Sequence, residues 1–388
     1  MADHPVTVTI DEERWEKIQV LTHGAASLCY QCGMCTASCP WGRVRDRGLS
    51  VREMVRRAQL GLWDEGQDLW WCTTCGRCEI TCPRGVRIRD VIRGLRYLAW
   101  EERRVPGGFP SLLWSIYWNN NPWSQPPSHR VQWAEKLDIP RYTKAHDILL
   151  YLGCTVSYDH RARQIARSLI RLLKRADISF GILGEAEPCC GEPVLAVGHL
   201  LYFQDLMTQN IERFREHGVT RVVTVSPHCY DTLKNHYDWP DEPPVEVVHY
   251  TELLFELLRE KRLVVHHTPF EGRVAYHDPC YLARYNGVTE APRACLAAVA
   301  GDSLVELDHN REWTLCCGGG GGRMWLETRA EERFSNLRVR DAQEKNVDVL
   351  LTACPMCLTC LEDSRSALGI SSLKVLDIAE FLEPFTAE

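Results

Sequence analysis

Two hydrophobic patterns alternate through the C-terminal part of this chain. Short runs rich in β-branched residues, such as 147–152 and 222–225, are followed by longer stretches with helical spacing, such as 161–174 and 251–261. This alternation is typical of α/β folds with parallel strands. Because ligands of such sheets bind where the strands end at their carboxyl ends, we expect a site there.

The N-terminal part reads differently and is predicted to be helical. A helical pattern closes at 95–100, and a Val-Pro-Gly-Gly break follows at 105–108. The stretch from there to about Ala145 contains five prolines after the break and four tryptophans. We interpret residues 105–146 as a Pro/Trp-rich linker whose tryptophans pack between domains.

The chain beyond residue 147 is an internal duplication. Four short segments recur in order at an offset of 126 to 128 residues. The matched segments begin at Tyr151 and His277, Cys189 and Cys316, Ser226 and Cys354, and Thr251 and Ile378. Ordered matches at a nearly constant offset indicate a repeated unit of domain size. We therefore predict a helical domain at 1–104, a first α/β unit at 147–270 and a second at 271–388.

Composition narrows the class of protein. The 388 residues are 45% hydrophobic, which suffices for two or three cores. The net charge of −7 argues against nucleic-acid binding. The longest apolar candidate, around 109–118, is shorter than the ~20 residues of a membrane span. The polar start at 11–15 does not resemble a secretory leader, so we expect a cytoplasmic protein with reduced thiols that reaches a membrane only through a partner.

Eight of the nineteen cysteines form two copies of the spacing C-x2-C-x2-C-x3-C-P. This spacing belongs to bacterial ferredoxins with two [4Fe–4S] clusters, in which the fourth cysteine of each run binds the other cluster. One cluster is therefore assigned to Cys29, Cys32, Cys35 and Cys82, and the other to Cys72, Cys75, Cys78 and Cys39. Zinc is the alternative, but zinc sites do not need eight thiolates at this spacing.

The second α/β unit contains five further cysteines in a pattern suited to iron: Cys280, Cys316, Cys317, Cys354 and Cys357. The adjacent thiolates of Cys316 and Cys317 can bridge neighbouring irons, and the total is one more than a cubane cluster requires. A run of glycines follows directly. We expect it to leave room for a substrate sulfur or for N–H donors to the cluster, with Gly318, Gly319 and Gly320 nearest.

The first unit departs from this pattern. Ser226 stands where the second unit has Cys354, which leaves Cys154, Cys189, Cys190 and Cys229. Four thiolates suit a [4Fe–4S] cluster, which we favour, or a closed zinc site, and Ser226 or His228 is a candidate for an additional ligand.

The remaining candidates are single residues. His277 precedes Cys280, and we interpret it as a candidate for proton delivery to a leaving thiolate, because imidazole titrates near neutral pH. Cys295 lies in an apolar helical context, and Cys360 has no cysteine counterpart in the first unit. Both are interpreted as structural thiols.

The cysteine pattern of the second unit resembles the cysteine-rich CCG domain. Two such units behind a two-cluster ferredoxin module resemble the D-type catalytic chain of heterodisulfide reductase, equivalent to its C and B chains fused. The resemblance implies that the five cysteines hold a noncubane [4Fe–4S] cluster to which a disulfide sulfur binds. The family mechanism uses two noncubane clusters, so the four-thiolate first unit puts cleavage at two sites in question.

The predicted function is that of an iron–sulfur oxidoreductase subunit. Electrons would pass from a flavin-containing subunit or electron-transfer flavoprotein, through the ferredoxin module, to the second CCG unit. The donor must be another chain, because the glycine run at 318–322 lacks the context of a dinucleotide-binding loop. The alternative is a relay between such a flavoprotein or a dehydrogenase and a quinone or a membrane cytochrome, without disulfide chemistry.

Overall fold

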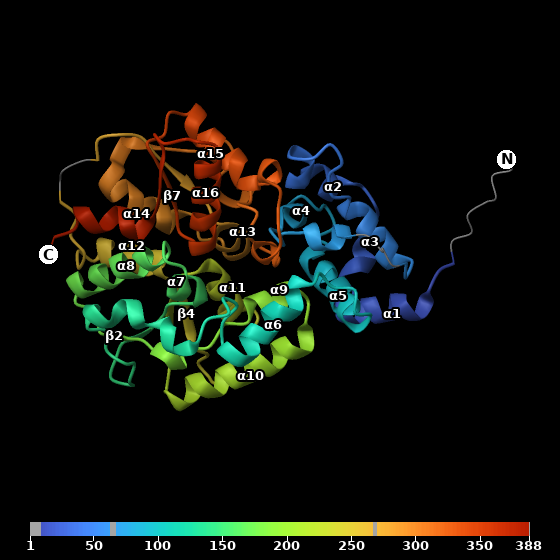
Figure 1. The fold of residues 1–388 in the computed structure, drawn as a ribbon, viewed down its shortest axis with the longest axis horizontal. Helices are drawn as coiled ribbons and strands as arrows, with labels where there is room; N and C mark the ends of the chain where they lie inside the picture. The colour runs from blue at the N-terminus through green and yellow to red at the C-terminus, as the bar shows by residue number, and fades with distance from the viewer. Residues whose placement is uncertain (1–8, 63–66, 267–269, 388) are drawn as a thin grey trace.

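The computed structural model describes residues 9–62, 67–266 and 270–387 and has three lobes. A helical lobe formed by the N-terminal residues lies at one end, and two α/β lobes lie side by side at the other (Figure 1). This arrangement confirms the predicted fold class, a helical two-cluster module followed by two α/β units.

The N-terminal lobe contains short helices around the cysteine loops. Its elements are α1 (Glu12–Leu21), α2 (Met34–Ser38), α3 (Val51–Gln59), α4 (Arg77–Ile80) and α5 (Ile88–Glu101). The helix α5 buries Val91, Leu95 and Leu98 because residues three and four apart share one face of a helix. Each cysteine loop turns at a glycine with positive φ, Gly33 or Gly76, and a short helix follows.

The linker packs within the chain as α6 (Gly108–Asn119) and irregular structure. Trp123 lies edge-on to Trp325 of the second unit, with ring centroids 5.3 Å apart. Trp114 and Trp118, by contrast, are exposed on α6.

The first α/β unit is a four-stranded parallel sheet of order β2-β1-β3-β4. Its strands are β1 (Ile148–Tyr151), β2 (Phe180–Gly181), β3 (Arg221–Thr224) and β4 (Glu246–His249). Its helices are α7 (Cys154–Tyr158), α8 (Arg163–Arg175), α9 (Glu192–Ala196), α10 (Leu200–Glu216), α11 (Pro227–Asn235) and α12 (Tyr250–Arg259). All four residues of β1 are buried, as expected for a parallel strand covered on both faces.

The second unit repeats this topology with strand order β6-β5-β7-β8, again parallel. Its strands are β5 (Val274–His277), β6 (Leu304–Val305), β7 (Val349–Thr352) and β8 (Lys374–Asp377). Its helices are α13 (Cys280–Asn286), α14 (Glu290–Ala300), α15 (Phe334–Glu344), α16 (Pro355–Ala367) and α17 (Ile378–Leu382).

The two units face each other through equivalent helices, as the two halves of a symmetric dimer would. Helix α12 packs on α14, and its counterpart α17 packs on α8, the counterpart of α14. Helix α11 likewise packs on α13, and α16 packs on α7. The duplication therefore creates a pseudo-two-fold interface, in which each contact recurs with the units exchanged.

In the described part of the chain, no helix combines the length and the apolar content needed to cross a membrane.

Candidate iron–sulfur and substrate site

The structure brings Cys39 together with the second cysteine run. One cavity of the N-terminal lobe is lined by Cys39, Cys72, Cys75 and Cys78, the crossed ligand set expected from the ferredoxin spacing. Burial raises the pKa of Cys39, Cys72 and Cys78, for Cys72 to about 11, and a hydrogen bond with Cys316 together with burial raises that of Cys75, so these thiols are protonated at neutral pH without metal. Four soft ligands around one cavity suit an iron–sulfur cluster. Bound metal would keep these cysteines as thiolates, whereas burial without metal favours the protonated thiols.

The other assigned ferredoxin set opens to the molecular surface at one of its four cysteines. Cys32 is exposed, Cys29 and Cys82 are half-buried, and Cys35 is buried. Leu28, Tyr30 and Met34 surround this loop and are also exposed. This cluster position is therefore open to another protein.

The five cysteines of the second unit meet where β5 and β7 end. Cys280 begins α13, three residues after the end of β5, and Cys354 is the N-cap of α16, two residues after the end of β7. The Sγ atoms of Cys317 and Cys357 lie 3.3 Å apart. Cys316 contacts both Cys280 and Cys317. The strand ends thus converge on one buried group of thiols, which fits a cluster by the chemistry of its donors.

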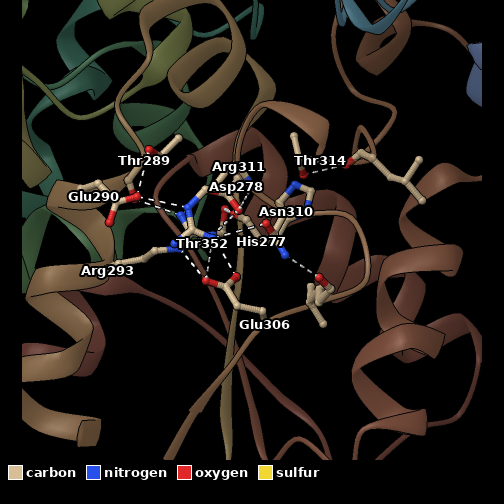
Figure 2. A network of polar contacts seen from close by, with 12 residues as sticks. His277, Asp278, Thr289, Glu290, Arg293, Glu306, Asn310, Arg311, Thr314 and Thr352 are labelled. Carbon is tan, nitrogen blue, oxygen red and sulfur yellow. Dashed lines mark hydrogen bonds and ion pairs between the residues drawn. The ribbon is translucent and has the colours of Figure 1, made fainter. Parts of the chain in front are cut away.

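A polar network holds the two loops that carry Cys280 and Cys316 (Figure 2). Arg293 donates two hydrogen bonds to Asp278, at 2.7 and 2.8 Å, and two to Glu306, at 2.7 and 2.9 Å. The backbone N–H of Arg311 donates to Asp278 at 2.9 Å. Because Asp278 precedes Cys280 and Arg311 precedes Cys316, this network fixes both ligands before a metal binds.

Hydrogen bonds distinguish individual thiols of this site. The N–H of Gly318 donates to the Cys316 Sγ at 3.2 Å, which is the kind of donor expected of the glycine run. Burial opposes the ionisation of Cys354, yet hydrogen bonds from Cys357 and His228 lower its pKa.

His277 lies against the same thiols. Its ring and the Sγ atoms of Cys317 and Cys357 lie within 4.8 Å of one another. Neither ring nitrogen has a hydrogen-bond partner among the described residues, and burial lowers the pKa of His277 well below its usual range. The ring is therefore a neutral imidazole beside two cysteine sulfur atoms. The proton-delivery role of His277 stays a prediction.

The ferredoxin module touches the second unit at its ligand loops. Cys75, which the sequence assigns to one of the two ferredoxin clusters, contacts Cys316 directly. Arg284 donates to the Cys75 carbonyl at 2.6 Å, and the hydroxyl of Tyr285 donates to the Thr74 carbonyl at 2.7 Å. The two thiolate groups are thus neighbours across a domain boundary.

Glycines make this approach possible. A Cβ on Gly320 would lie 2.5 Å from the Thr73 carbonyl oxygen, and one on Gly321 would lie 2.3 Å from that of Cys72. The buried Arg96 completes the junction by donating to carbonyls of all three lobes, on Leu69, Cys72, Ala196 and Gly321. The glycine run therefore serves two purposes. Gly320 and Gly321 allow the close approach of the ferredoxin module, whereas Gly318 and Gly319 border a cavity.

That cavity has a volume of ≈ 830 Å³ and reaches Cys317 from solvent. Its walls are aromatic and charged. Trp41, Trp71 and Phe334 line it with arginines such as Arg45 and Arg323 and with the carboxylates of Glu327, Glu332 and Asp363, and Arg45 is paired with Glu332. Cys360, interpreted from the sequence as structural, also lines it. A Cβ on Gly319 would lie 3.0 Å from the Cys360 Sγ and 3.9 Å from the Cys317 Sγ.

The first unit brings its four cysteines to a smaller cavity. Cys154, Cys189, Cys190 and Cys229 line it together with Ser226 and His228. The hydroxyl of Ser226 accepts from the His228 N–H at 3.3 Å and so caps α11 as Cys354 caps α16.

An ion pair between Glu187 and the linker residue Arg130 supports Cys154, the first cysteine of this unit. Glu187 accepts from the N–H groups of Leu152 and Gly153, at 3.0 and 2.9 Å. Arg130, from the linker, donates to Glu187 at 2.8 Å and to the Cys154 Sγ at 3.5 Å. The linker thus contributes to the first-unit site.

Sequence reasoning missed several of these participants. Arg130 and Arg96 carry no motif, and for Cys360 only its position one helical turn after Cys357 was a signal. His228 was expected only as an additional ligand of its own unit. Cys295 is buried in α14, as its sequence context indicated. It lies beside the Thr251 carbonyl, away from the cysteine groups of the two CCG units.

Fold and thiol groups together define a class of protein, an iron–sulfur oxidoreductase with a ferredoxin module and a duplicated cysteine-rich unit. Comparison with protein families agrees. Residues 25–86 match the 4Fe-4S dicluster domain, and residues 148–234 and 274–362 match the cysteine-rich domain, CCG.

Relatives among characterised proteins identify the family. The chain is 31% identical to the D-type chain of the dihydromethanophenazine:CoB–CoM heterodisulfide reductase of Methanosarcina barkeri, over 97% of this chain and 97% of the relative. It is 36% identical to the EtfAB:quinone oxidoreductase of Syntrophomonas wolfei, over 81% of this chain and 46% of the relative. The chain spans about half the length of that relative and of a probable iron–sulfur-binding oxidoreductase of Bacillus subtilis, of which it also covers 46%. The chain belongs to the family of CCG-domain iron–sulfur oxidoreductases that includes the D-type chain of heterodisulfide reductase.

Proposed function

We propose that this chain passes electrons from a flavin-containing partner to a small-molecule substrate at the second CCG unit, in the manner of a heterodisulfide reductase. The cavity of ≈ 830 Å³ beside Cys317 is the observation that carries this proposal. A protein that only relays electrons needs clusters near its surface but no space for a substrate beside them. Here the space adjoins the five-cysteine site.

The arrangement of thiols supports one direction of travel within the chain. The exposed ligands around Cys32 are the entry point for a partner, the flavin-containing subunit or electron-transfer flavoprotein. The cluster bound by the buried set that contains Cys75 receives the electrons next. The contact of Cys75 with Cys316 is the step to the second unit.

Iron–sulfur clusters bound by these thiolates, two cubane clusters and a noncubane cluster in the second unit, would supply one-electron redox chemistry. The protein's own residues bind and orient. Cys280, Cys316, Cys317, Cys354 and Cys357 hold the metal, and Gly318 and Gly319 keep its cavity side free of side chains. Arg323, which hydrogen-bonds neutral oxygens of Glu327 and Thr328, favours an anionic group on the substrate. His277, close to Cys317 and Cys357, is positioned to donate an N–H to sulfur.

A second function has its own support. The first unit has four cysteines, which suit an ordinary [4Fe–4S] cluster or zinc and not a second noncubane cluster, and one relative is named as an EtfAB:quinone oxidoreductase. A relay between a flavoprotein and a quinone or membrane partner, without disulfide chemistry, is therefore the alternative.

Two substitutions separate chemistry from delivery. We expect Cys317→Ser to lower the turnover of a disulfide substrate at least a hundredfold. Both ferredoxin clusters should still take up electrons from the donor. Cys32→Ser should instead block electron entry and leave the second-unit cluster reducible by dithionite. Electron paramagnetic resonance (EPR) after single-turnover mixing distinguishes the two blocks.

Cys295→Ser is the matched control, because this buried thiol lies away from both thiolate groups. It should retain turnover and every cluster signal. Physiological turnover by Cys317→Ser protein whose second-unit cluster is absent would contradict the proposal.

A further inference from the structure

His228 belongs to the first CCG unit but faces the second. It is the second residue of α11, and its ring stacks on that of Tyr281 in α13, with centroids 4.0 Å apart. Its Nδ1 lies 3.1 Å from the Oε1 of Glu192. All three side chains are buried, so the ring has one fixed orientation.

The other side of this ring reaches Cys354 of the second unit. A hydrogen bond joins the imidazole to the Cys354 sulfur. Glu192 faces Nδ1 at ion-pair distance, and we assign the other nitrogen, Nε2, to Cys354. The side chains of Glu192, His228 and Cys354 thus form a row across the boundary between the units.

The pseudo-two-fold interface explains how a first-unit residue comes to lie there. Helix α11 packs on α13, and its counterpart α16 packs on α7. The position equivalent to His228 is Met356, which closes the cavity of the first-unit cysteines. Each unit therefore extends one side chain, at the same position, into the site of the other.

We propose that His228 is a positioning residue of the second-unit site, supplied by the first unit, which donates an Nε2–H hydrogen bond to the Cys354 sulfur and thereby raises the reduction potential of the cluster bound there. Hydrogen bonds to a ligating sulfur withdraw charge from it and favour the reduced, more negative cluster. Glu192 and Tyr281 hold the donor in place.

This inference rests on the proposed function, since it requires a cluster in the second unit. It gives the first unit a role that does not depend on its missing fifth cysteine.

The test compares His228→Leu with His228→Gln in full-length, anaerobically purified protein. Leucine cannot donate a hydrogen bond, whereas the glutamine amide can. We expect His228→Leu to lower the ratio of reduced to oxidised second-unit cluster at a fixed potential by about tenfold, which is about 59 mV for a one-electron couple. His228→Gln should restore most of this shift. EPR-monitored redox titration measures it, and the signal that Cys317→Ser removes identifies the second-unit cluster.

His199→Asn is the matched control. His199 is also a first-unit histidine, but it caps α10 and its ring lies against Trp100 and Tyr202, and asparagine retains the cap. It should leave the second-unit potential unchanged.

Two results would overturn the inference at full iron loading: an unshifted second-unit potential in His228→Leu, or a shift confined to the first-unit signal. If the unaltered protein shows no second-unit cluster at all, the proposed function fails and this inference fails with it, a result visible before any variant is made.

Discussion

Ser226 and Cys354 occupy the same position in the two units and perform the same structural task. Each accepts a hydrogen bond from a backbone N–H in the first turn of the helix that follows, at 3.3 Å for Ser226 and 3.5 Å for Cys354. A hydroxyl caps a helix at least as well as a thiol, so the exchange leaves the fold intact. We therefore expect the difference between the units at this position to concern metal ligation.

Ser226→Cys should then change the metal centre of the first unit. The new thiol keeps the cap and adds a fifth sulfur to the cavity that holds Cys154 and Cys229. We expect a changed EPR or Mössbauer signature for this site, with the ferredoxin signals unaltered.

Ser226→Ala provides the comparison, because it removes the cap without adding a ligand. It should cost about 1 kcal/mol of unfolding free energy and leave the spectrum as it was. An unchanged spectrum of fully iron-loaded Ser226→Cys protein would show that geometry, and not ligand number, sets the cluster type.

At the scale of elements, the decisive feature is the glycine loop between η8 (Arg311–Trp313) and α15. Its first part borders the cavity, and its second part lies against the Cys72–Thr73 backbone of the ferredoxin module. A loop with side chains would hold the two modules apart. Electron transfer depends on distance, so this contact is as much part of the function as the ligands are.

Gly321→Ala tests that contact. The residue has φ +64°, and the added Cβ would lie 2.3 Å from the Cys72 carbonyl oxygen, so the modules must separate. We expect slower reduction of the second-unit cluster by the ferredoxin module in rapid-mixing experiments, and a loss of about 1–3 kcal/mol of unfolding free energy from the clash.

Gly287→Ala is the control for backbone strain alone. Gly287 has a similar φ of +67°, but no atom lies within 4 Å of its added Cβ. It should cost about 1 kcal/mol and leave the transfer rate unchanged. Equal transfer rates in both variants would show that the close approach at Gly321 is unimportant for electron flow.

On the scale of the whole molecule, three lobes meet around Arg96, whose guanidinium donates to backbone carbonyls of each. Burial lowers the pKa of Arg96 to about 10, which still leaves it charged at neutral pH. A permanent cation at this junction lies beside the Cys72 loop and opposes the negative charge of loaded clusters.

Metal analysis of the whole chain gives the broadest test. With four irons per cluster, anaerobically purified protein should contain about sixteen irons if both CCG units hold clusters, or about twelve with one zinc if the first unit binds zinc. Inductively coupled plasma mass spectrometry gives both metals. Reconstitution that stops at about eight irons would contradict clusters in the CCG units.

The sequence by itself determined the local structure and supplied the proposed ligand sets. The runs at 147–152 and 222–225 are strands β1 and β3, and the helical stretches at 161–174 and 251–261 coincide with α8 and α12 to within two residues. Periodicity, cysteine spacing and the duplication are carried by residues close in sequence or by direct repetition, so they can be recognised without a structure.

Only the tertiary structure decided which groups meet across the lobes. The contact of Cys75 with Cys316, the reach of His228 to Cys354, and the placement of Arg130 behind Cys154 all join different lobes or the linker. Only the folded chain shows that Cys360 lines the cavity beside Cys317. These meetings follow from how non-periodic surfaces pack together, and that complementarity leaves no regular pattern along the chain.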